Sequence, residues 1–217
     1  MSVPALLDHV VIAGPDLDEL VAWFAGATGV TAAPGGVHAS TGTANALVAL
    51  TVEGERRPHY VELIAPDPDG TVEAVKFGIP GLTAPRVVTY AVHPPDLDAV
   101  VAASRARGYD PGPVEDLSRR TPDGTLLRWR LTHARADRPD VPFLIDWGTT
   151  PHPGLTVGPA LDVVAFTPTA VDDRTVAALA PLGLLPGPVS GPGDAAADDV
   201  PGHTLRVRRP DGSVVVL

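Results

Sequence analysis

The chain has 217 residues, of which 44% are hydrophobic and 19% charged, a composition typical of a globular protein with a sizeable core. A net charge of −10 argues against a nucleic-acid-binding surface, and the absence of cysteine excludes disulfides, thiolate metal sites and cysteine nucleophiles. No apolar run approaches the roughly 20 residues that cross a bilayer, and no secretory signal is visible. We therefore expect a cytoplasmic protein without a nucleic-acid or membrane partner.

The first segment is predicted to be a strand followed by a helix. Residues 7–13 form an apolar, β-branched run that Pro15 ends. Asp16 is placed to cap a helix whose apolar residues recur at helical spacing, and Gly29 is expected to end it. Three further strands are expected before the next such segment, within residues 30–40, 43–52 and 59–66.

A second segment repeats this pattern. The tetrad Pro-Asp-Leu-Asp occurs at residues 15–18 and again at 95–98, each time between a β-rich run and a helix that ends near a glycine. Three strands are again expected afterwards, and the sequence Pro122-Asp123-Gly124 is typical of a hairpin turn between the first two.

A third, weaker copy begins at residue 161. Its two final strands flank Pro210-Asp211-Gly212, and the pattern then stops one strand short. The sequence thus predicts an α+β fold of tandem βαβββ units, whose curved mixed sheets surround a cleft, with a truncated third βαββ unit. We assign the units to residues 5–80, 85–150 and 158–217 of one compact body, with a loose loop over 186–201 and the third unit as a packing or capping element.

Several motifs resemble the vicinal oxygen chelate superfamily, and within it the glyoxalase-like domain group. They are "LDHVVIAGPDLDELVAWF", "GGVHASTGTANALVAL", "YVELIAP", "RRTPDGTLLRWRL" and "PFLIDW". The resemblance implies two units that curl around a cleft for a small molecule. It also implies a divalent metal ion, such as Mg, Mn, Fe or Zn, bound by the first and fourth strand of each unit.

Carrying those positions over gives His9, Glu62 and Asp146 as metal ligands, with Thr89 where a fourth ligand would stand. Independently of the resemblance, Glu62 lies between two apolar residues of a strand and so points to the face opposite theirs. His9 could instead be a hydrogen-bonded core histidine, and both carboxylates could be solvated strand-end residues.

Other residues are candidates for contact with a substrate. His38 and Glu62 are predicted to transfer protons as catalytic residues, and Asn45, Thr89 and Trp147 are predicted to bind substrate. As alternatives, His38 could lie on a surface turn, Asn45 could bond only to backbone, and Trp147 could be a core residue. The remaining histidines lie beside turns, where structural roles are more common, although His152 could close the edge of the cleft.

Two functions of different class fit these features. The first is a glyoxalase-like enzyme, an isomerase, lyase or oxygenase, that acts on a substrate with adjacent oxygens and uses a divalent metal. The alternative is a metal-free protein that sequesters a drug or natural product in the same cleft, and an interaction module with an unused cleft is a third option. The sequence allows a monomer or a homodimer.

Overall fold

The computed structural model describes residues 3–4, 6–189 and 202–217. Within these residues all strands join one mixed sheet in the order β11-β10-β9-β3-β2-β6-β7-β8-β5-β1-β4. The strands are β1 (Leu7–Ala13), β2 (Ala33–His38), β3 (Thr43–Val52), β4 (Glu55–Pro66), β5 (Arg86–Val92), β6 (Glu115–Arg120), β7 (Leu126–Leu131), β8 (Phe143–Asp146), β9 (Ala160–Pro168), β10 (His203–Arg208) and β11 (Val214–Val216). The helices are α1 (Leu17–Thr28), α2 (Leu97–Ala106), α3 (Pro153–Thr156), α4 (Asp173–Leu179) and the 3₁₀ turns η1 (Lys76–Gly81) and η2 (Ala180–Leu182).

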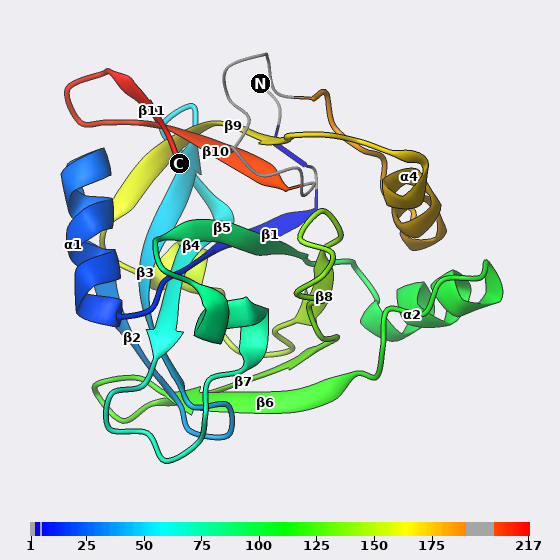
Figure 1. The fold of residues 1–217 in the computed structure, drawn as a ribbon, viewed down its shortest axis with the longest axis horizontal. Coiled ribbons are helices and arrows are strands. Elements are labelled where there is room, and N and C mark those ends of the chain that lie inside the picture. The colour runs from blue at the N-terminus through cyan, green and yellow to red at the C-terminus, as the bar shows by residue number, and fades with distance from the viewer. Residues whose placement is uncertain (1–2, 5, 190–201) are drawn as a thin grey trace.

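Strands β1 to β8 close into a ring, because β3 also pairs with β4. The first unit contributes β1 to β4 and the second β5 to β8, and the units meet where β1 pairs with β5 and where β2 pairs with β6. Helix α1 lies on one side of this ring, and α2 and α4 lie on the other (Figure 1). The predicted α+β class with tandem units and curved sheets is confirmed.

The capping signals of both long helices act as predicted. The Asp16 carboxylate accepts a hydrogen bond of 2.9 Å from the backbone N–H of Glu19, and Asp96 does the same for Ala99 in the second copy of the tetrad. Helix α1 ends at Gly29, whose φ of 77° lies in the left-handed region that glycine adopts without strain.

The two Pro-Asp-Gly sequences form matching hairpin turns. Gly124 donates its N–H to the Thr121 carbonyl (2.8 Å), and Gly212 donates to the Arg209 carbonyl (2.9 Å). The first turn joins β6 to β7 and the second joins β10 to β11. Their correspondence is the basis for the prediction that the third copy stops one strand short.

The third segment has the predicted order of elements, but its strands do not pair as those of the first unit do. Strand β1 pairs in parallel with β4, whereas β9 pairs antiparallel with β10. Strand β9 also pairs in parallel with β3, where Ala49 lies opposite Ala160. The bounds of the three units stay an interpretation of the sequence, and the predicted loop over 186–201 falls mostly outside the described residues.

The buried apolar residues divide into two clusters, on the two faces of the ring strands. The outer cluster includes Val10 and Val61 with Phe24 of α1 and Phe166 of β9, so it holds the helices and the third segment against the sheet. The inner cluster contains Tyr60, Trp129, Leu131, Phe143, Ile145 and Trp147. Strand β1 is buried along its whole length because it has core on both faces. Among the described residues, no helix is long and apolar enough to span a membrane.

Candidate functional site

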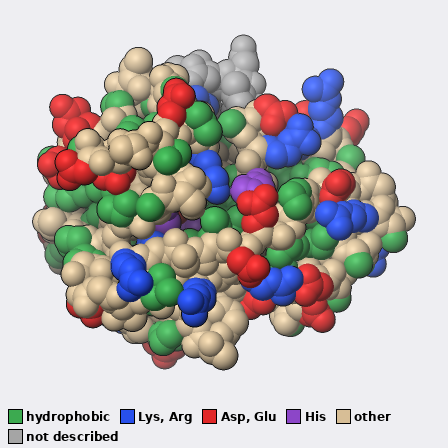
Figure 2. Space-filling model, turned by 90° about the horizontal axis from the view of Figure 1, so that it is seen from below, with side chains coloured by type: hydrophobic (Ala, Val, Ile, Leu, Met, Phe, Trp, Pro, Cys, Tyr) green, Lys and Arg blue, Asp and Glu red, His purple; other side chains and the backbone are tan. Residues whose placement is uncertain are grey.

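A pocket lies within the ring of strands and is lined by residues of both units. Its free space, counted together with the solvent at its open side, is about 790 Å³. Seen from below, histidine and basic side chains are visible in a hollow of the surface (Figure 2). Its polar lining includes His9, His38, Asn45, Glu62, Lys76 and Arg119, and its apolar lining combines aromatic and aliphatic side chains.

Asp8 and His9 are consecutive residues of β1, and in a regular strand their side chains would point to opposite faces. Here the two side chains contact each other beside the pocket. Leu7 pairs with Val92 and His9 with Ala91, so Asp8 is an extra residue in the register. Such a bulge re-aims a side chain. As a result, one Asp8 carboxylate oxygen lies 2.6 Å from His9 Nδ1.

Asp8 is 0% exposed and is surrounded by donors. Its second oxygen accepts from Trp147 Nε1 (3.0 Å) and His152 Nε2 (2.9 Å), and His93 Nδ1 lies 3.5 Å away. Burial alone would raise the pKa of Asp8, but the hydrogen bonds and charges of His152 and His9 outweigh it, and the pKa lies well below its usual range. Asp8 is therefore a buried carboxylate that stays ionised.

This carboxylate fixes the tautomer of His9. Because ionised Asp8 only accepts hydrogen bonds, Nδ1 of His9 carries a proton toward it, and in the uncharged form of the ring Nε2 has a free lone pair. Nε2 is 3.7 Å from a carboxylate oxygen of Glu62, and the other oxygen of Glu62 accepts from Asn45 Nδ2 at 2.5 Å. The His9 ring also stacks on Tyr60, with centroids 4.5 Å apart. His9 and Glu62 thus lie side by side at the pocket, each held in a fixed orientation by its neighbours.

His38 occupies another part of the pocket lining. Its Nδ1 lies 3.1 Å from the Thr43 hydroxyl, and its ring meets Trp129 edge to face. Burial lowers the pKa of His38 to about 4, more than the nearby charge of Glu62 raises it. His38 is therefore neutral at pH 7 and can exchange hydrogen bonds with a ligand.

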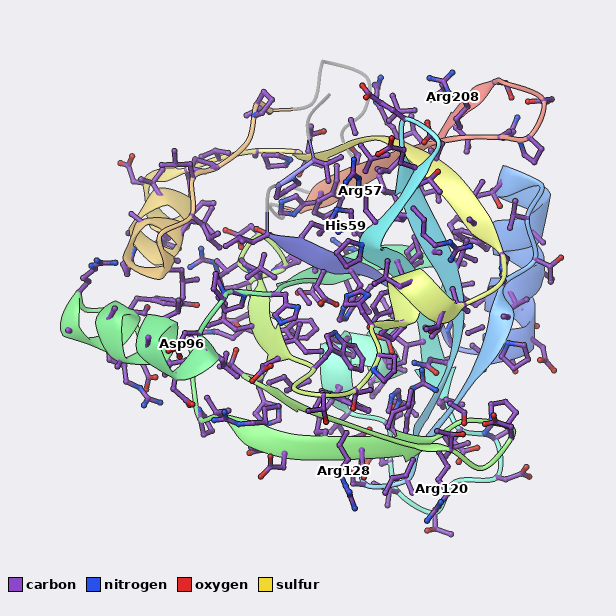
Figure 3. The ribbon with its side chains drawn as sticks, turned by 180° about the vertical axis from the view of Figure 1, so that it is seen from behind. Arg57, His59, Asp96, Arg120, Arg128 and Arg208 are labelled. Carbon is purple, nitrogen blue, oxygen red and sulfur yellow. The ribbon has the colours of Figure 1, made fainter. Side chains whose placement is uncertain are left out.

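Two cationic side chains reach the pocket as well. Arg119 of β6 is only 5% exposed and donates to the Gly35 carbonyl, whereas its neighbour Arg120 points away from the ring, as does Arg128 (Figure 3). Lys76 of η1 is half-buried. Burial lowers the pKa of both groups, although nearby carboxylates oppose this.

The structure does not bring Asp146 to His9 and Glu62. Its neighbours Ile145 and Trp147 line the pocket, so alternation along β8 turns Asp146 to the other face. There it accepts from the Gly148 N–H (2.8 Å) and lies 4.0 Å from Arg130. The match of "FLIDW" with "YVELI" set Asp146 opposite Glu62, although Asp146 lies one residue further along its strand. A shift of one residue turns a side chain to the other face of the sheet.

Of the other predicted site residues, all but Thr89 line the pocket. Asn45, Trp147 and His38 line the pocket together with His9 and Glu62. Thr89 is buried opposite Val11 and is not among the lining residues, and its hydroxyl has no hydrogen-bond partner in the described residues. Trp147 closes the wall and also holds Asp8.

The donor set does not fit the four-ligand metal site that the resemblance implies. Only His9 and Glu62 converge, and the β8 side chains on the pocket wall, Phe143 and Ile145, are apolar. A different group could hold a divalent ion, since Asp8, His93 and His152 place one ligand atom each within 4.8 Å of one another. His152 Nδ1 already accepts from the Gly154 N–H, so Nε2 carries a proton toward Asp8 that a metal would have to displace.

Sequence reasoning missed Asp8, Arg119 and Lys76, and it placed His152 at the edge of the cleft without foreseeing its hydrogen bond to Asp8. The bulge that turns Asp8 and the long-range contact of His152 leave no local signal. Arg119 lies on the same strand face as Leu117, which also lines the pocket, but the sequence does not mark that face as the inner one. Lys76 is the only lysine of the sequence, and no motif around it indicates a pocket.

The sequence profile of the glyoxalase-like domain family matches residues 7–182. The chain belongs to this family, and its fold is that of the vicinal oxygen chelate superfamily. No curated protein matches the chain. Together with the enclosed pocket, the family supports a protein that acts on or binds a small molecule.

Several solved structures are similar to this chain, and one with a TM-score above 0.5 has the same type of fold. A hypothetical protein from Staphylococcus aureus is 16% identical, with a TM-score of 0.58 over 97% of this chain and 84% of that chain. Methylmalonyl-CoA epimerase from Mycobacterium tuberculosis is 24% identical, with a TM-score of 0.41 over 67% of this chain and 88% of that chain. A Streptomyces coelicolor methylmalonyl-CoA epimerase variant, in complex with 2-nitronate-propionyl-CoA, is 23% identical, with a TM-score of 0.44 over 68% and 98% of the two chains.

Proposed function

We propose that the protein is an enzyme that moves a proton on a small carbonyl compound, with His9 and Glu62 as its acid–base pair. The observation that carries this proposal is the chain of contacts from buried Asp8 through His9 to Glu62. A carboxylate that orients a histidine, whose other nitrogen faces a cavity, is the usual arrangement of a general base.

The reaction that follows from this geometry is an isomerisation or epimerisation. One member of the pair removes a proton from the carbon next to the carbonyl, and the electron pair of that C–H bond moves to the carbonyl oxygen to give an enolate. The other member, 3.7 Å away, returns a proton to the same or a neighbouring carbon. Asp8 is a positioning residue in this scheme, and it stabilises the imidazolium that forms when His9 accepts a proton.

Asn45 and Tyr60 position the pair. Asn45 holds one oxygen of Glu62, so the other oxygen is directed toward His9. Tyr60 stacks on the imidazole and fixes its plane. Burial raises the pKa of Tyr60 well above its usual value, so its hydroxyl stays protonated and can donate to a ligand oxygen. No step requires a metal ion between His9 and Glu62.

The test is solvent deuterium exchange, followed by proton NMR on a panel of small carbonyl compounds in D₂O with EDTA. We expect the wild type to remove the C–H signal next to the carbonyl of at least one class. Glu62→Gln and His9→Gln should each slow this exchange by about 10²–10⁴-fold. Exchange at the wild-type rate in both variants would overturn the assignment.

A metal-free binding protein is the second candidate. The aromatic walls favour it, because Tyr60, Trp129, Phe143 and Trp147 offer flat apolar surface to a ligand. This candidate predicts tight binding without exchange, and Glu62→Gln would then change affinity but no rate.

A further inference from the structure

The pocket is positively charged inside an acidic protein. The chain has a net charge of −10, yet Glu62 is the sole carboxylate on the pocket lining, beside two cationic side chains, Lys76 and Arg119. His133, which also lines the pocket, is already paired with Glu115 at 2.8 Å. Ionised Asp8 lies behind His9 and is not part of the lining, so the lining itself carries one more positive than negative charge, which favours an anion.

Neither cation has a carboxylate partner in the described part of the chain. Arg119 donates to the Gly35 backbone carbonyl, and Lys76 forms no ion pair there. Glu62 is held by Asn45 and faces His9 instead. Buried charges are normally paired, so a nearly buried arginine with free donors is better explained by a ligand that brings the opposite charge.

The backbone around both groups is arranged to place them. A Cβ on Gly36 would lie 3.2 Å from Arg119 Nη1 and 2.2 Å from the Arg120 carbonyl oxygen, so glycine makes room where β2 meets β6. Lys76 precedes Phe77, a non-glycine residue with a φ of 57°, and Gly78, with a φ of 71°. Phe77 packs on Phe143 across the pocket, which holds this segment beside the cavity. Strained backbone of this kind is concentrated at functional sites.

We infer that Arg119 and Lys76 bind a 2-oxo carboxylate, so that the substrate is a small organic acid with a carbonyl next to its carboxylate. This inference rests on the proposed proton transfer and names its substrate class. The planar guanidinium fork of arginine matches the two oxygens of a carboxylate, and the compact ammonium of lysine suits the single carbonyl oxygen. Lys76 then also neutralises the charge that this oxygen gains in the enolate.

The test compares two probes of nearly the same shape that differ in charge. Oxamate carries a carboxylate beside a carbonyl, and oxamide is its neutral analogue. Binding is measured by calorimetry and by the fluorescence of Trp129 and Trp147, which line the pocket, in buffer with EDTA. We expect oxamate to bind the wild type at least 10-fold more tightly than oxamide.

The variants assign this binding to the two cations. Arg119→Gln and Lys76→Gln should each weaken oxamate binding by at least 10-fold, and Lys76→Arg should retain most of it. Arg120→Gln is the matched control, because Arg120 is adjacent in sequence but points outward, and it should bind as the wild type does. If Arg119→Gln does not fold, the Lys76 variants decide the question, because Lys76 lies half-exposed in a short turn.

The outcomes separate this inference from the proposed function. Glu62→Gln should still bind oxamate, while proton exchange is lost. Oxamate binding without exchange in the wild type would support the anion site and overturn the proton-transfer role. Equal binding of oxamate and oxamide, or unchanged oxamate binding in both cation variants, would overturn the anion site even if neutral carbonyl compounds exchange.

Discussion

Trp147 donates a hydrogen bond of 3.0 Å to the Asp8 carboxylate, and this bond joins the end of β8 to the start of β1. The two residues belong to different predicted units and lie 139 positions apart in the chain. The carboxylate that orients His9 is thus held by the second unit, so the acid–base pair depends on both units being docked.

Asp8→Asn should destabilise the protein by about 3–5 kcal/mol, because the buried network loses its anion and an amide NH₂ replaces one of the two oxygens that accept from His9, Trp147 and His152. Urea unfolding at pH 7 measures this. Asp98→Asn is the control, since Asp98 pairs with Arg130 on the surface and its loss should have little effect. Equal stability of the two variants would mean that the Asp8 network is not a stabilising one.

His9→Gln should reduce proton exchange by about 10²–10⁴-fold. Stability should fall less than in Asp8→Asn, because Asp8 keeps Trp147 and His152 as donors. Exchange rates and urea midpoints of the two variants decide this. A large stability loss with normal exchange would assign His9 to the core alone.

Stability should decrease as the pH falls from about 6.5 to about 4. Burial lowers the pKa values of His38 and His203 to about 4, so in this window the unfolded chain binds protons that the folded chain does not. Asp8 adds nothing there, because its lowered pKa preserves its contribution until more acidic conditions. Urea midpoints across this range should have a smaller pH slope in His203→Gln, and an unchanged slope would contradict the assignment.

Chelation should leave proton exchange unchanged, because the pocket brings together only two of the predicted ligands. The measurement is the exchange rate before and after dialysis against EDTA. A rate that falls and returns with added Mg²⁺, Mn²⁺ or Zn²⁺ would contradict this. If it does, His93→Ala shows whether the ion lies at Asp8, His93 and His152, since His93 is outside the pocket lining.

Phe166→Ala should destabilise the protein by about 3–5 kcal/mol, because Phe166 is fully buried in the outer cluster with residues of the first two units. Thermal and urea unfolding measure this, with Val216→Ala on the exposed end of β11 as a control. A negligible loss would mean that the third segment is dispensable for the core.

Sequence patterns sufficed where the signals are local. Asp16 and Gly29 bound α1 through chemistry within one helical turn, and the alternation around Glu62 placed its side chain correctly. Asp146 also lies between apolar residues of a strand, but its neighbours line the pocket whereas those of Glu62 face the outer core, so the same pattern places the two carboxylates on opposite faces. The Asp8 bulge and the antiparallel pairing of β9 depend on contacts between distant strands, which no local pattern records.

The two junctions that close the ring differ in strength. Strand β1 is paired with β5 along its length, whereas in the described residues β2 meets β6 at the single registered pair of Val37 and Arg120. The junction between β1 and β5 is therefore strong, and the junction between β2 and β6 is weak. Backbone amides at the weak junction should exchange their hydrogens with solvent first, as in other locally opening regions. Arg119 of β6 crosses this junction by its hydrogen bond to the Gly35 carbonyl of β2. An anion bound to Arg119 would therefore stabilise the closed junction and slow its opening.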